Sequence, residues 1–272
     1  MTGRTIGPCR PAELIGPGPY APRVISDEAR AWRNGKLDRV CDAIEAWEHG
    51  RVVRATRHPN YFDLNCVLVE EPAGMNASSL IAVADRYLAR FRHRKLEMDL
   101  VEEAEGVRPD FDERGWKSSR LVWMRHDAPL PAGPKVPVEE VPYDSVHDLR
   151  DTWHREDYPD LDPGEYHAEA REVALQCGAR VFASVEDGAP VGFSEVEYRD
   201  GSAEVASVYV LPEHRGGGRG TAITRAAIEA CSDADDLWIV ADDEDRPKEL
   251  YRRLGFRPKW ISMEFLLPPA PS

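Results

Sequence analysis

The segment VYVLPEHRGGGRGTAI, which runs from Val208 to Ile223, constrains the fold more than any other part of the chain. An apolar run is followed by a proline, a basic pair, four glycines within five positions, and then small and aliphatic residues. This order predicts a strand, a tight turn and a helix. Backbone N–H groups at the start of a helix have no partner within it, and glycine lets an anion approach them without a Cβ in the way. The segment therefore predicts an anion-binding turn.

Two common phosphate-binding motifs do not describe this turn. No Gly-Lys-Ser/Thr follows it, as a P-loop requires. The run GGGRGT also lacks the Gly-x-Gly-x-x-Gly spacing of dinucleotide-binding folds. The residues ahead of it predict a hairpin that turns at Asp187 and Gly188, rather than a βαβ unit.

Helices and strands alternate through the rest of the second half. Two helices are predicted over 144–157 and 163–178, and the hairpin follows over 179–198. After it come a strand over 202–211, a helix over 218–231, a buried strand over 236–241, a helix over 246–255 and one or two final strands over 256–267. This order predicts an α/β fold, in finer terms an α+β mixed sheet with helices on its faces.

Composition and charge both change near residue 130. Residues 127–142 contain five prolines and one glycine, which disfavour regular structure and indicate a linker. Residues 1–130 carry 20 basic and 20 acidic residues, whereas residues 131–272 carry 15 basic and 29 acidic residues. The net charge of −14 therefore comes from the second part. We predict two domains, 1–130 and 131–272.

Charge and residue usage exclude several classes of protein. A nucleic-acid-binding surface would be basic, and no stretch approaches the roughly 18 apolar residues that span a bilayer. The N-terminus has no apolar secretion signal, the five cysteines lack a Cys-x-x-Cys pair, and the eight histidines lack metal-ligand spacing. We expect a cytoplasmic protein with no nucleic-acid partner, no membrane contact and no metal. Six lysines against 29 arginines suggest a GC-rich bacterial genome.

The glycine-rich turn resembles the pyrophosphate loop of the Gcn5-related N-acetyltransferases (GNAT). The family signature, Arg/Gln-x-x-Gly-x-Gly/Ala, is present as Arg215-x-x-Gly218-x-Gly220. A second family motif, Tyr-x-x-x-Gly-Phe, runs from Tyr251 to Phe256. The resemblance covers about residues 135–267. It implies a complete GNAT acyl-CoA N-acyltransferase fold in the C-terminal domain, with acetyl-CoA as co-substrate and no metal.

The resemblance also implies roles for residues of this sequence. The loop would hold the pyrophosphate of coenzyme A, the strand before it would pair with the pantetheine arm, and Tyr251 would protonate the departing thiolate. The coenzyme-binding residues implied are Val208, Tyr209, Val210, Arg215, Gly216, Gly217, Gly218, Arg219, Gly220 and Thr221. The family commonly has Asn and Ala ahead of the tyrosine. Here DDEDRPKELY has acids and Pro247 instead, so we expect the acetyl end of the coenzyme to be held differently.

The catalytic base is expected among glutamates of two neighbouring strands. Glu204 lies sixteen residues before Gly220, the offset of the catalytic glutamate in the histone acetyltransferases of this superfamily. Alternation places Glu204 on the same face as Val208 unless a bulge intervenes. Glu195 and Glu197 on the preceding strand are the alternatives.

The N-terminal domain is predicted to be a degenerate, partial copy of the same GNAT fold. From the end of its predicted strand at Leu68 to Gly115 is 47 residues, and from Val210 to Gly255 is 45. Its loop, VEEPAGMNAS, lacks the Arg-x-x-Gly-x-Gly signature. We expect no catalysis there and a role in covering the acceptor cleft, in a layout similar to that of tandem members of the family.

The favoured function is transfer of acetyl from acetyl-CoA to a primary amine of a small acceptor by direct attack. Six acidic residues between 154 and 169, together with Glu195, Glu197 and Glu204, predict an acceptor that is cationic when it arrives. The alternatives are a non-catalytic acyl-CoA sensor or scaffold, and a transferase of a different acyl group. The protein is expected to act as a monomer or homodimer.

Overall fold

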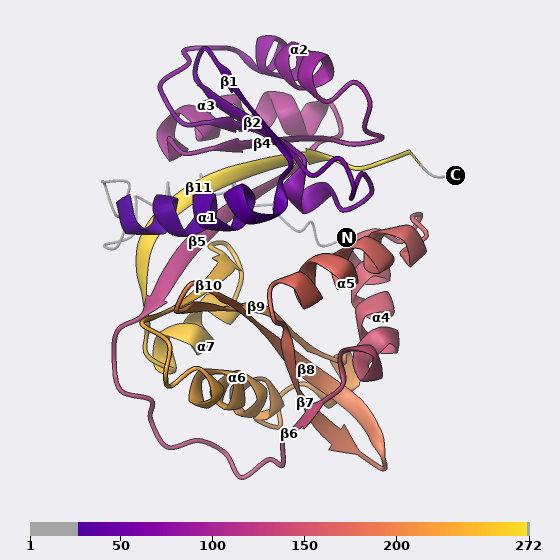
Figure 1. Ribbon diagram of the computed structural model, residues 1–272, viewed down its shortest axis with the longest axis vertical. Coiled ribbons are helices and arrows are strands. Elements are labelled where there is room, and N and C mark those ends of the chain that lie inside the picture. Colours follow the sequence, from indigo (N-terminus) through magenta and orange to yellow (C-terminus); the bar gives the residue numbers. More distant parts are fainter. Residues whose placement is uncertain (1–26, 271–272) are drawn as a thin grey trace, which may run out of the picture.

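The computed structural model describes residues 27–270 and has one mixed sheet of eleven strands (Figure 1). The predicted absence of a secretion signal, and Cys9, lie outside the described residues. The strand order is β1-β2-β3-β4-β11-β5-β10-β9-β8-β7-β6. The strands are β1 (Ala43–Trp47), β2 (Gly50–Arg54), β3 (Cys66–Val69), β4 (Arg94–Met98), β5 (Lys117–His126), β6 (Glu139–Val141), β7 (Arg180–Glu186), β8 (Ala189–Arg199), β9 (Ser202–Val210), β10 (Asp236–Asp242) and β11 (Phe256–Leu267).

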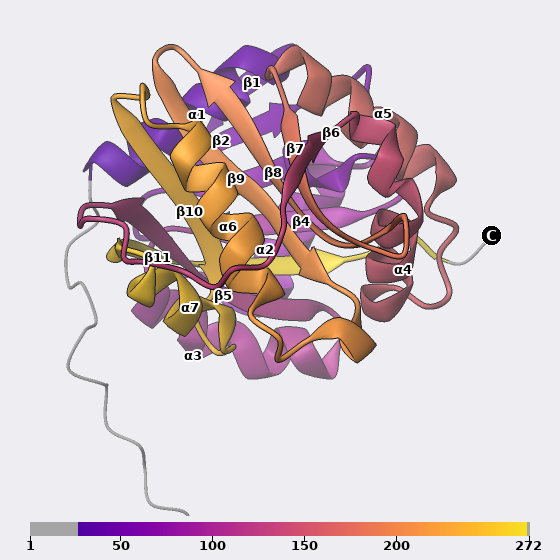
Figure 2. The same ribbon diagram turned by 90° about the horizontal axis from the view of Figure 1, so that it is seen from below.

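Helices pack against the sheet in both halves of the chain, and Figure 2 shows α6 lying across the strands of the second half. The first half contains α1 (Asp27–Val40), α2 (Ala77–Tyr87), α3 (Val101–Glu113) and the 3-10 helix η1 (Phe62–Leu64). The second half contains α4 (His147–Asp157), α5 (Gly164–Gln176), α6 (Arg219–Ala230), α7 (Pro247–Arg253) and the 3-10 helices η2 (Tyr143–Val146) and η3 (Pro212–His214). The predicted arrangement of helices on a mixed sheet is confirmed.

The two halves repeat one order of elements. The first half runs β3-α2-β4-α3-β5 and the second runs β9-α6-β10-α7-β11. The pairs β3–β4 and β9–β10 are both parallel. Near the end of α3, the ring of Phe111 meets that of Trp116 edge to face, with centroids 5.0 Å apart. Near the end of α7, the ring of Tyr251 meets that of Phe256 in the same way, with centroids 6.3 Å apart. The first half therefore has the layout of the predicted partial copy.

The last strands of the two halves are exchanged. The strand β5, which ends the first half, lies between β10 and β11, and β11, which ends the second half, lies between β4 and β5. β11 pairs with β5 at ten positions and with β4 at five. Figure 1 shows these two long strands crossing between the halves. The predicted domain boundary at 130/131 falls in the linker between β5 and β6. It stays a prediction, because β5 of the first half pairs with two strands of the second half, and β11 of the second half pairs with two strands of the first.

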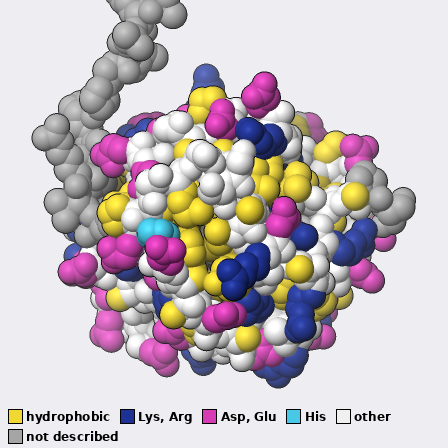
Figure 3. Space-filling view, turned by 90° about the horizontal axis from the view of Figure 1, so that it is seen from above, with side chains coloured by type: hydrophobic (Ala, Val, Ile, Leu, Met, Phe, Trp, Pro, Cys, Tyr) yellow, Lys and Arg dark blue, Asp and Glu magenta, His cyan; other side chains and the backbone are white. Residues whose placement is uncertain are grey.

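The central position of β11 explains its composition. A strand with neighbours on both edges and side chains packed on both faces needs apolar residues in succession. The run FRPKWISMEFLL supplies them, and Phe256, Trp260 and Phe265 are buried. One hydrophobic cluster lies under α6 and α7 and another under α2 and α3. On the outside, the face over the first half mixes basic and acidic side chains (Figure 3), as its balanced charge requires.

Two findings in the described residues concern membrane-spanning helices and cysteines. Among residues 27–270, no helix is long and apolar enough to cross a bilayer. The four described cysteines, Cys41, Cys66, Cys177 and Cys231, are buried thiols without disulfides.

Candidate active site

The parallel strands β9 and β10 separate partway along their length. They pair at four positions, the last being Val205 with Ile239, whereas β9 continues to Val210 and β10 to Asp242. Beyond Val205, the edge of β9 that faces β10 therefore has backbone groups that no described strand uses. A ligand with an extended amide backbone can pair with such an edge.

A β-bulge in β9 lies at the point of separation. On β8, Glu195 is opposite Ser207 and Val196 is opposite Val205, so Ala206 is the extra residue. The bulge ends strict alternation along β9 at this point.

The bulge decides which β9 residues share a face. Glu204 and Ser207 line a cavity on one face, whereas Val208 packs in the hydrophobic cluster under α6 on the other. A Cβ added at Gly220, in the first turn of α6, would lie 4.0 Å from Val210 Cγ2. Val208 and Val210 therefore face α6. Glu204 does not share a face with Val208, because the bulge that the prediction allowed for is present.

The glycine-rich loop follows β9 and ends at the first turn of α6. Gly216 and Gly218 have φ angles of 85° and 82°, in the left-handed region that favours glycine, and Gly218 directly precedes the helix. Within the described residues, the N–H groups of Gly216, Gly217 and Gly218 donate to no backbone acceptor. The first N–H groups of α6 also lack intrahelical partners. The loop thus has the free donors that an anion site requires, and that it binds one stays a prediction.

The basic side chains of the loop already have protein partners. Arg215 Nε donates to the Val210 carbonyl at 2.9 Å, and Arg219 Nη2 donates to Glu186 at 2.6 Å. The backbone, rather than free arginine side chains, therefore provides the unoccupied donors of the loop.

Tyr251 lies on the α6 face of the sheet, buried in the same cluster as Val205 and Ile239. Burial raises the pKa of its phenol, with a smaller contribution from Asp245, so it stays protonated. Tyr251 does not line the cavity that contains Glu204. The two predicted catalytic residues thus lie on opposite faces of the sheet, each beside the region where β9 and β10 separate.

A cavity of about 420 Å³ lies between the two halves. Its walls come from α1, η1 and β4 of the first half and from α4, α5, β8 and β9 of the second. Eight of the lining residues are aromatic: Trp32, Tyr61, Phe62, Trp123, Tyr143, Trp153, Tyr158 and Tyr166. The first half therefore forms part of the cavity wall, and its role in covering the acceptor stays a prediction.

Each candidate base is paired with a cation. Glu195 accepts from Arg150 Nη1 at 2.7 Å, and burial raises the pKa of this glutamate despite that partner. Glu197 lies 2.8 Å from Nζ of Lys36, a residue of α1 in the first half. Burial opposes the charge of Lys36, but Glu197 and Glu204 outweigh it and raise its pKa.

Glu204 has two cations near it. Arg199 Nη2 donates to Glu204 at 3.1 Å, and Lys36 Nζ lies 3.9 Å away. Arg199 could have been found in the sequence, because it continues the alternation of Glu195 and Glu197 along one strand. Lys36 carried no such signal, because its place depends on how α1 crosses the second half.

The acidic residues between 154 and 169 do not form one surface. Of the six, only Asp157 lines the cavity. Glu156 accepts from the Tyr209 hydroxyl at 2.7 Å, and Glu169 accepts from the Asn60 backbone and side chain at 2.7 and 2.8 Å. Some of the acidic residues from which a cationic acceptor was predicted therefore form structural hydrogen bonds.

The corresponding loop of the first half, between β3 and α2, has three of its backbone donors bound to side chains of the first half. The N–H groups of Ala73 and Gly74 donate to the Glu103 carboxylate, at 3.2 and 2.7 Å, and Ser79 N–H donates to the Asn76 side chain at 2.9 Å. The strands β3 and β4 stay paired to the last residue of β3. In this loop an internal carboxylate therefore takes two of the backbone donors, and the strand edge before it is not open.

No group of three or more His, Cys, Asp or Glu side chains that could hold a metal ion occurs among residues 27–270.

Residues 178–258 match the family model of the acetyltransferase (GNAT) domain. A curated relative, an uncharacterized N-acetyltransferase (MJ1207) of Methanocaldococcus jannaschii, is 33% identical over 99 residues. The match spans 30% of this chain and 43% of that protein, less than half the relative's length.

Solved structures show the same fold across most of the chain. A functionally unknown protein from Staphylococcus epidermidis has a TM-score of 0.60 at 16% identity, over 85% of this chain and 95% of that one. A GCN5-related N-acetyltransferase from Kribbella flavida has a TM-score of 0.57 at 20% identity, over 91% and 96%. A tandem GNAT protein of the clavulanic acid pathway has a TM-score of 0.50 at 17% identity, over 93% and 91%. The predicted fold is confirmed across most of the chain, and the match to the GNAT domain itself lies within residues 178–258.

Proposed function

We propose that this chain transfers the acetyl group of acetyl-CoA to a primary amine. One observation carries the proposal. The separation of β9 from β10 and the free donors of the glycine-rich loop occur in succession along one stretch of chain. An extended amide next to a pyrophosphate needs that succession of an open strand edge and an anion site.

The coenzyme would be held mainly by backbone groups. The N–H groups from Gly216 to Thr221 would bind the pyrophosphate, with Arg215 and Arg219 beside it. The backbone of β9 from Val208 to Val210 would pair with the pantetheine arm. The acetyl group would then lie near the bulge at Ala206, at the edge of the cavity between the halves.

The reaction would proceed by direct attack. A carboxylate, Glu204 in the first place and Glu195 as the alternative, takes a proton from the arriving ammonium ion. The amine nitrogen attacks the acetyl carbon, the C–N bond forms, and the C–S bond breaks. The thiolate of coenzyme A takes a proton from the phenol of Tyr251, a group that burial keeps protonated. The attacking nitrogen loses its second proton to solvent as the amide forms, Tyr251 regains a proton from solvent, and the carboxylic acid releases its proton to solvent.

The acceptor would be a small molecule that enters the cavity between the halves. Its amine would be cationic on arrival, as the acids of the second half suggest, although each candidate base has a cationic partner. The charge balance, the reduced cysteines and the arginine usage support a cytoplasmic bacterial enzyme, which we expect to be a monomer or homodimer.

Release of free thiol from acetyl-CoA, measured with a panel of cationic, neutral and anionic amines at low and high salt, tests the function. We expect turnover that rises with pH, because the ammonium ion must lose a proton before its nitrogen attacks. Glu204→Gln should lower kcat by about 100-fold or more. Glu229→Gln, an exposed glutamate of α6 that pairs with Arg225, is the control.

Three results would change the proposal. Coenzyme binding without turnover of any amine would favour the sensor or scaffold. Faster turnover with another acyl-CoA would change the donor. If Glu204→Gln keeps the kcat of the unaltered protein and Glu195→Gln lowers it, Glu195 would be assigned as the base.

A further inference from the structure

The cavity wall contains buried hydrogen-bond donors that the protein does not use. Arg150 and Arg199 both line the cavity and are 8% and 4% exposed. Each makes one ion pair, Arg150 through Nη1 with Glu195 and Arg199 through Nη2 with Glu204. Within residues 27–270, Nε and Nη2 of Arg150, and Nε and Nη1 of Arg199, have no hydrogen-bond acceptor. Buried donors of this kind are costly unless something binds them.

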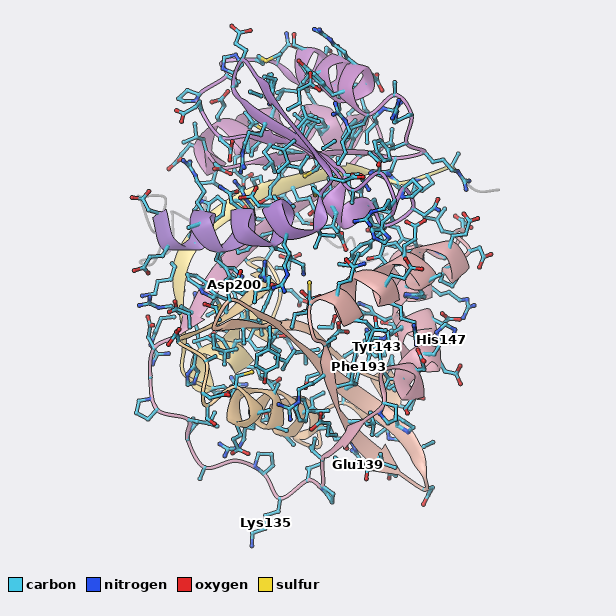
Figure 4. The ribbon with its side chains drawn as sticks, viewed as in Figure 1. Lys135, Glu139, Tyr143, His147, Phe193 and Asp200 are labelled. Carbon is cyan, nitrogen blue, oxygen red and sulfur yellow. The ribbon has the colours of Figure 1, made fainter. Side chains whose placement is uncertain are left out.

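Arg150 has the arrangement that favours a planar anion. Its guanidinium carbon lies 4.2 Å from the ring centroid of Tyr143 and 4.6 Å from that of Phe193. These two residues lie close together in Figure 4. The rings hold the plane of the guanidinium, and Nε and Nη2 form the edge that can donate to both oxygens of one carboxylate.

The three glutamates of β8 and β9 that line the cavity do not need another cation. Glu195, Glu197 and Glu204 have Arg150, Lys36 and Arg199 as partners. Glu197 Oε2 accepts no hydrogen bond but lies 2.8 Å from the Lys36 ammonium. Burial lowers the pKa of Arg199 in spite of Glu204 and Glu197, which marks its charge as incompletely compensated. The unmet capacity of the wall is therefore for an anion.

We infer that the acceptor carries a carboxylate beside its amine, and that Arg150 binds this carboxylate. The inference rests on the proposed function and narrows its acceptor from a net cation to an amino-acid-like zwitterion. Glu195, the partner of Arg150, is opposite Ser207 at the bulge, so the anion site and the reacting amine lie within reach of one small molecule. The free nitrogens are covered by neighbouring atoms, so the inference includes a movement of the Arg150 side chain toward the cavity when the ligand binds.

Binding is the decisive test, and it does not depend on turnover. Protein saturated with coenzyme A is titrated by calorimetry with the twenty amino acids, their carboxamides and their decarboxylated amines, and with phosphoethanolamine. We expect at least one amino acid to bind tenfold or more tightly than its carboxamide and its amine. Arg150→Gln should reduce that preference below threefold, and Arg150→Lys, which keeps the charge but not the two-donor edge, should give an intermediate value.

Arg155→Gln is the matched control, because Arg155 is an exposed arginine of the same helix whose partner is Asp151. It should leave the preference unchanged. Equal binding of acids and carboxamides, binding of none of the acids, tighter binding of phosphoethanolamine, or a preference that survives in Arg150→Gln would each overturn the inference. If Arg150→Gln does not fold, the comparison of ligands on the unaltered protein decides.

The two proposals fail in different ways. Equal acetylation of amines with and without a carboxylate would support the proposed transferase and contradict the carboxylate site. Tight binding of an amino acid without thiol release would support the carboxylate site and contradict the transferase.

Discussion

The loops after β3 and after β9 occupy the same place in two copies of one topology, but they differ in what their backbone donors bind. After β3, the N–H groups of Ala73 and Gly74 bind the Glu103 carboxylate. After β9, the N–H groups of Gly216 to Gly218 have no backbone acceptor within the described chain. In the first half, an internal carboxylate takes the place that an external anion would need.

The strands before the two loops differ in how far they are paired. β3 and β4 are paired to the last residue of β3, whereas β9 extends five residues beyond its last pairing with β10. Phe111 stands where the second half has Tyr251, with the same edge-to-face contact but no hydroxyl. This topology alone therefore does not make the coenzyme site that we propose for the second half. The proposed site needs free backbone donors and an open strand edge together.

The largest expected effect comes from separating the two halves. Residues 131–272 alone would leave β11 without β4 and β5, its two neighbours, and β10 without β5. We expect this fragment to show no cooperative unfolding transition by circular dichroism. Co-expression with residues 1–130 should restore a folded complex. A cooperative, coenzyme-binding fragment would show that the exchanged strands are not required and that 130/131 is an independent folding boundary.

The next effect separates the two loops. Gly218→Asp places a carboxylate among the free donors, at a φ of 82° that disfavours side chains and 3.1 Å from Pro134. Coenzyme A affinity, measured by calorimetry, should fall at least about 100-fold. Gly74→Asp makes the same change at a φ of 58° in the other loop and should leave the affinity unchanged. Equal losses in the two variants would mean that strain, rather than the anion site, explains the result.

Local sequence signals predicted the second half well, because its elements carry them. The turn at Asp187 and Gly188, the glycine-rich loop and the helix that ends before Gly255 all lie where the residues indicated. The exchanged strands could not be predicted. β5 and β11 have apolar composition that suits any central position, and their neighbours come from distant parts of the chain.

The cavity was predictable only in part. Glu195, Glu197 and Glu204 were identified from their positions on two strands, and all three line it. Their cations were missed. Lys36 reaches Glu197 from a helix more than 150 residues earlier in the chain, and no pattern around it indicated that contact. The acidic residues of the sequence therefore suggested a more negative cavity than the structure has, because ion pairs offset part of that negative charge.

Removing the internal anion tests the first half directly. Glu103→Ala leaves the N–H groups of Ala73 and Gly74 without their acceptor, so the free energy of unfolding should fall by about 2 kcal/mol. Glu102→Ala removes the neighbouring acid from the same first turn of α3 and should cost less than about 0.5 kcal/mol. Coenzyme stoichiometry should stay at one per chain, because β3 and β4 remain paired. A stoichiometry of two would show that Glu103 alone keeps the first site closed.

The smallest effect concerns the hydroxyl that distinguishes Tyr251 from Phe111. Tyr251→Phe gives the second half the aromatic pair of the first, and the Phe111–Trp116 contact shows that the packing does not need the oxygen. Stability should therefore change little, while kcat falls about tenfold, or about 1.4 kcal/mol, because the thiolate loses its proton donor. The reciprocal Phe111→Tyr places a hydroxyl at a side chain that is 0% exposed, so it should lower the melting temperature and leave kcat unchanged. The readouts are kcat from thiol release and the melting temperature of each variant. An unchanged kcat for Tyr251→Phe would assign the proton to solvent, and a large loss of stability would make Tyr251 a packing residue like Phe111.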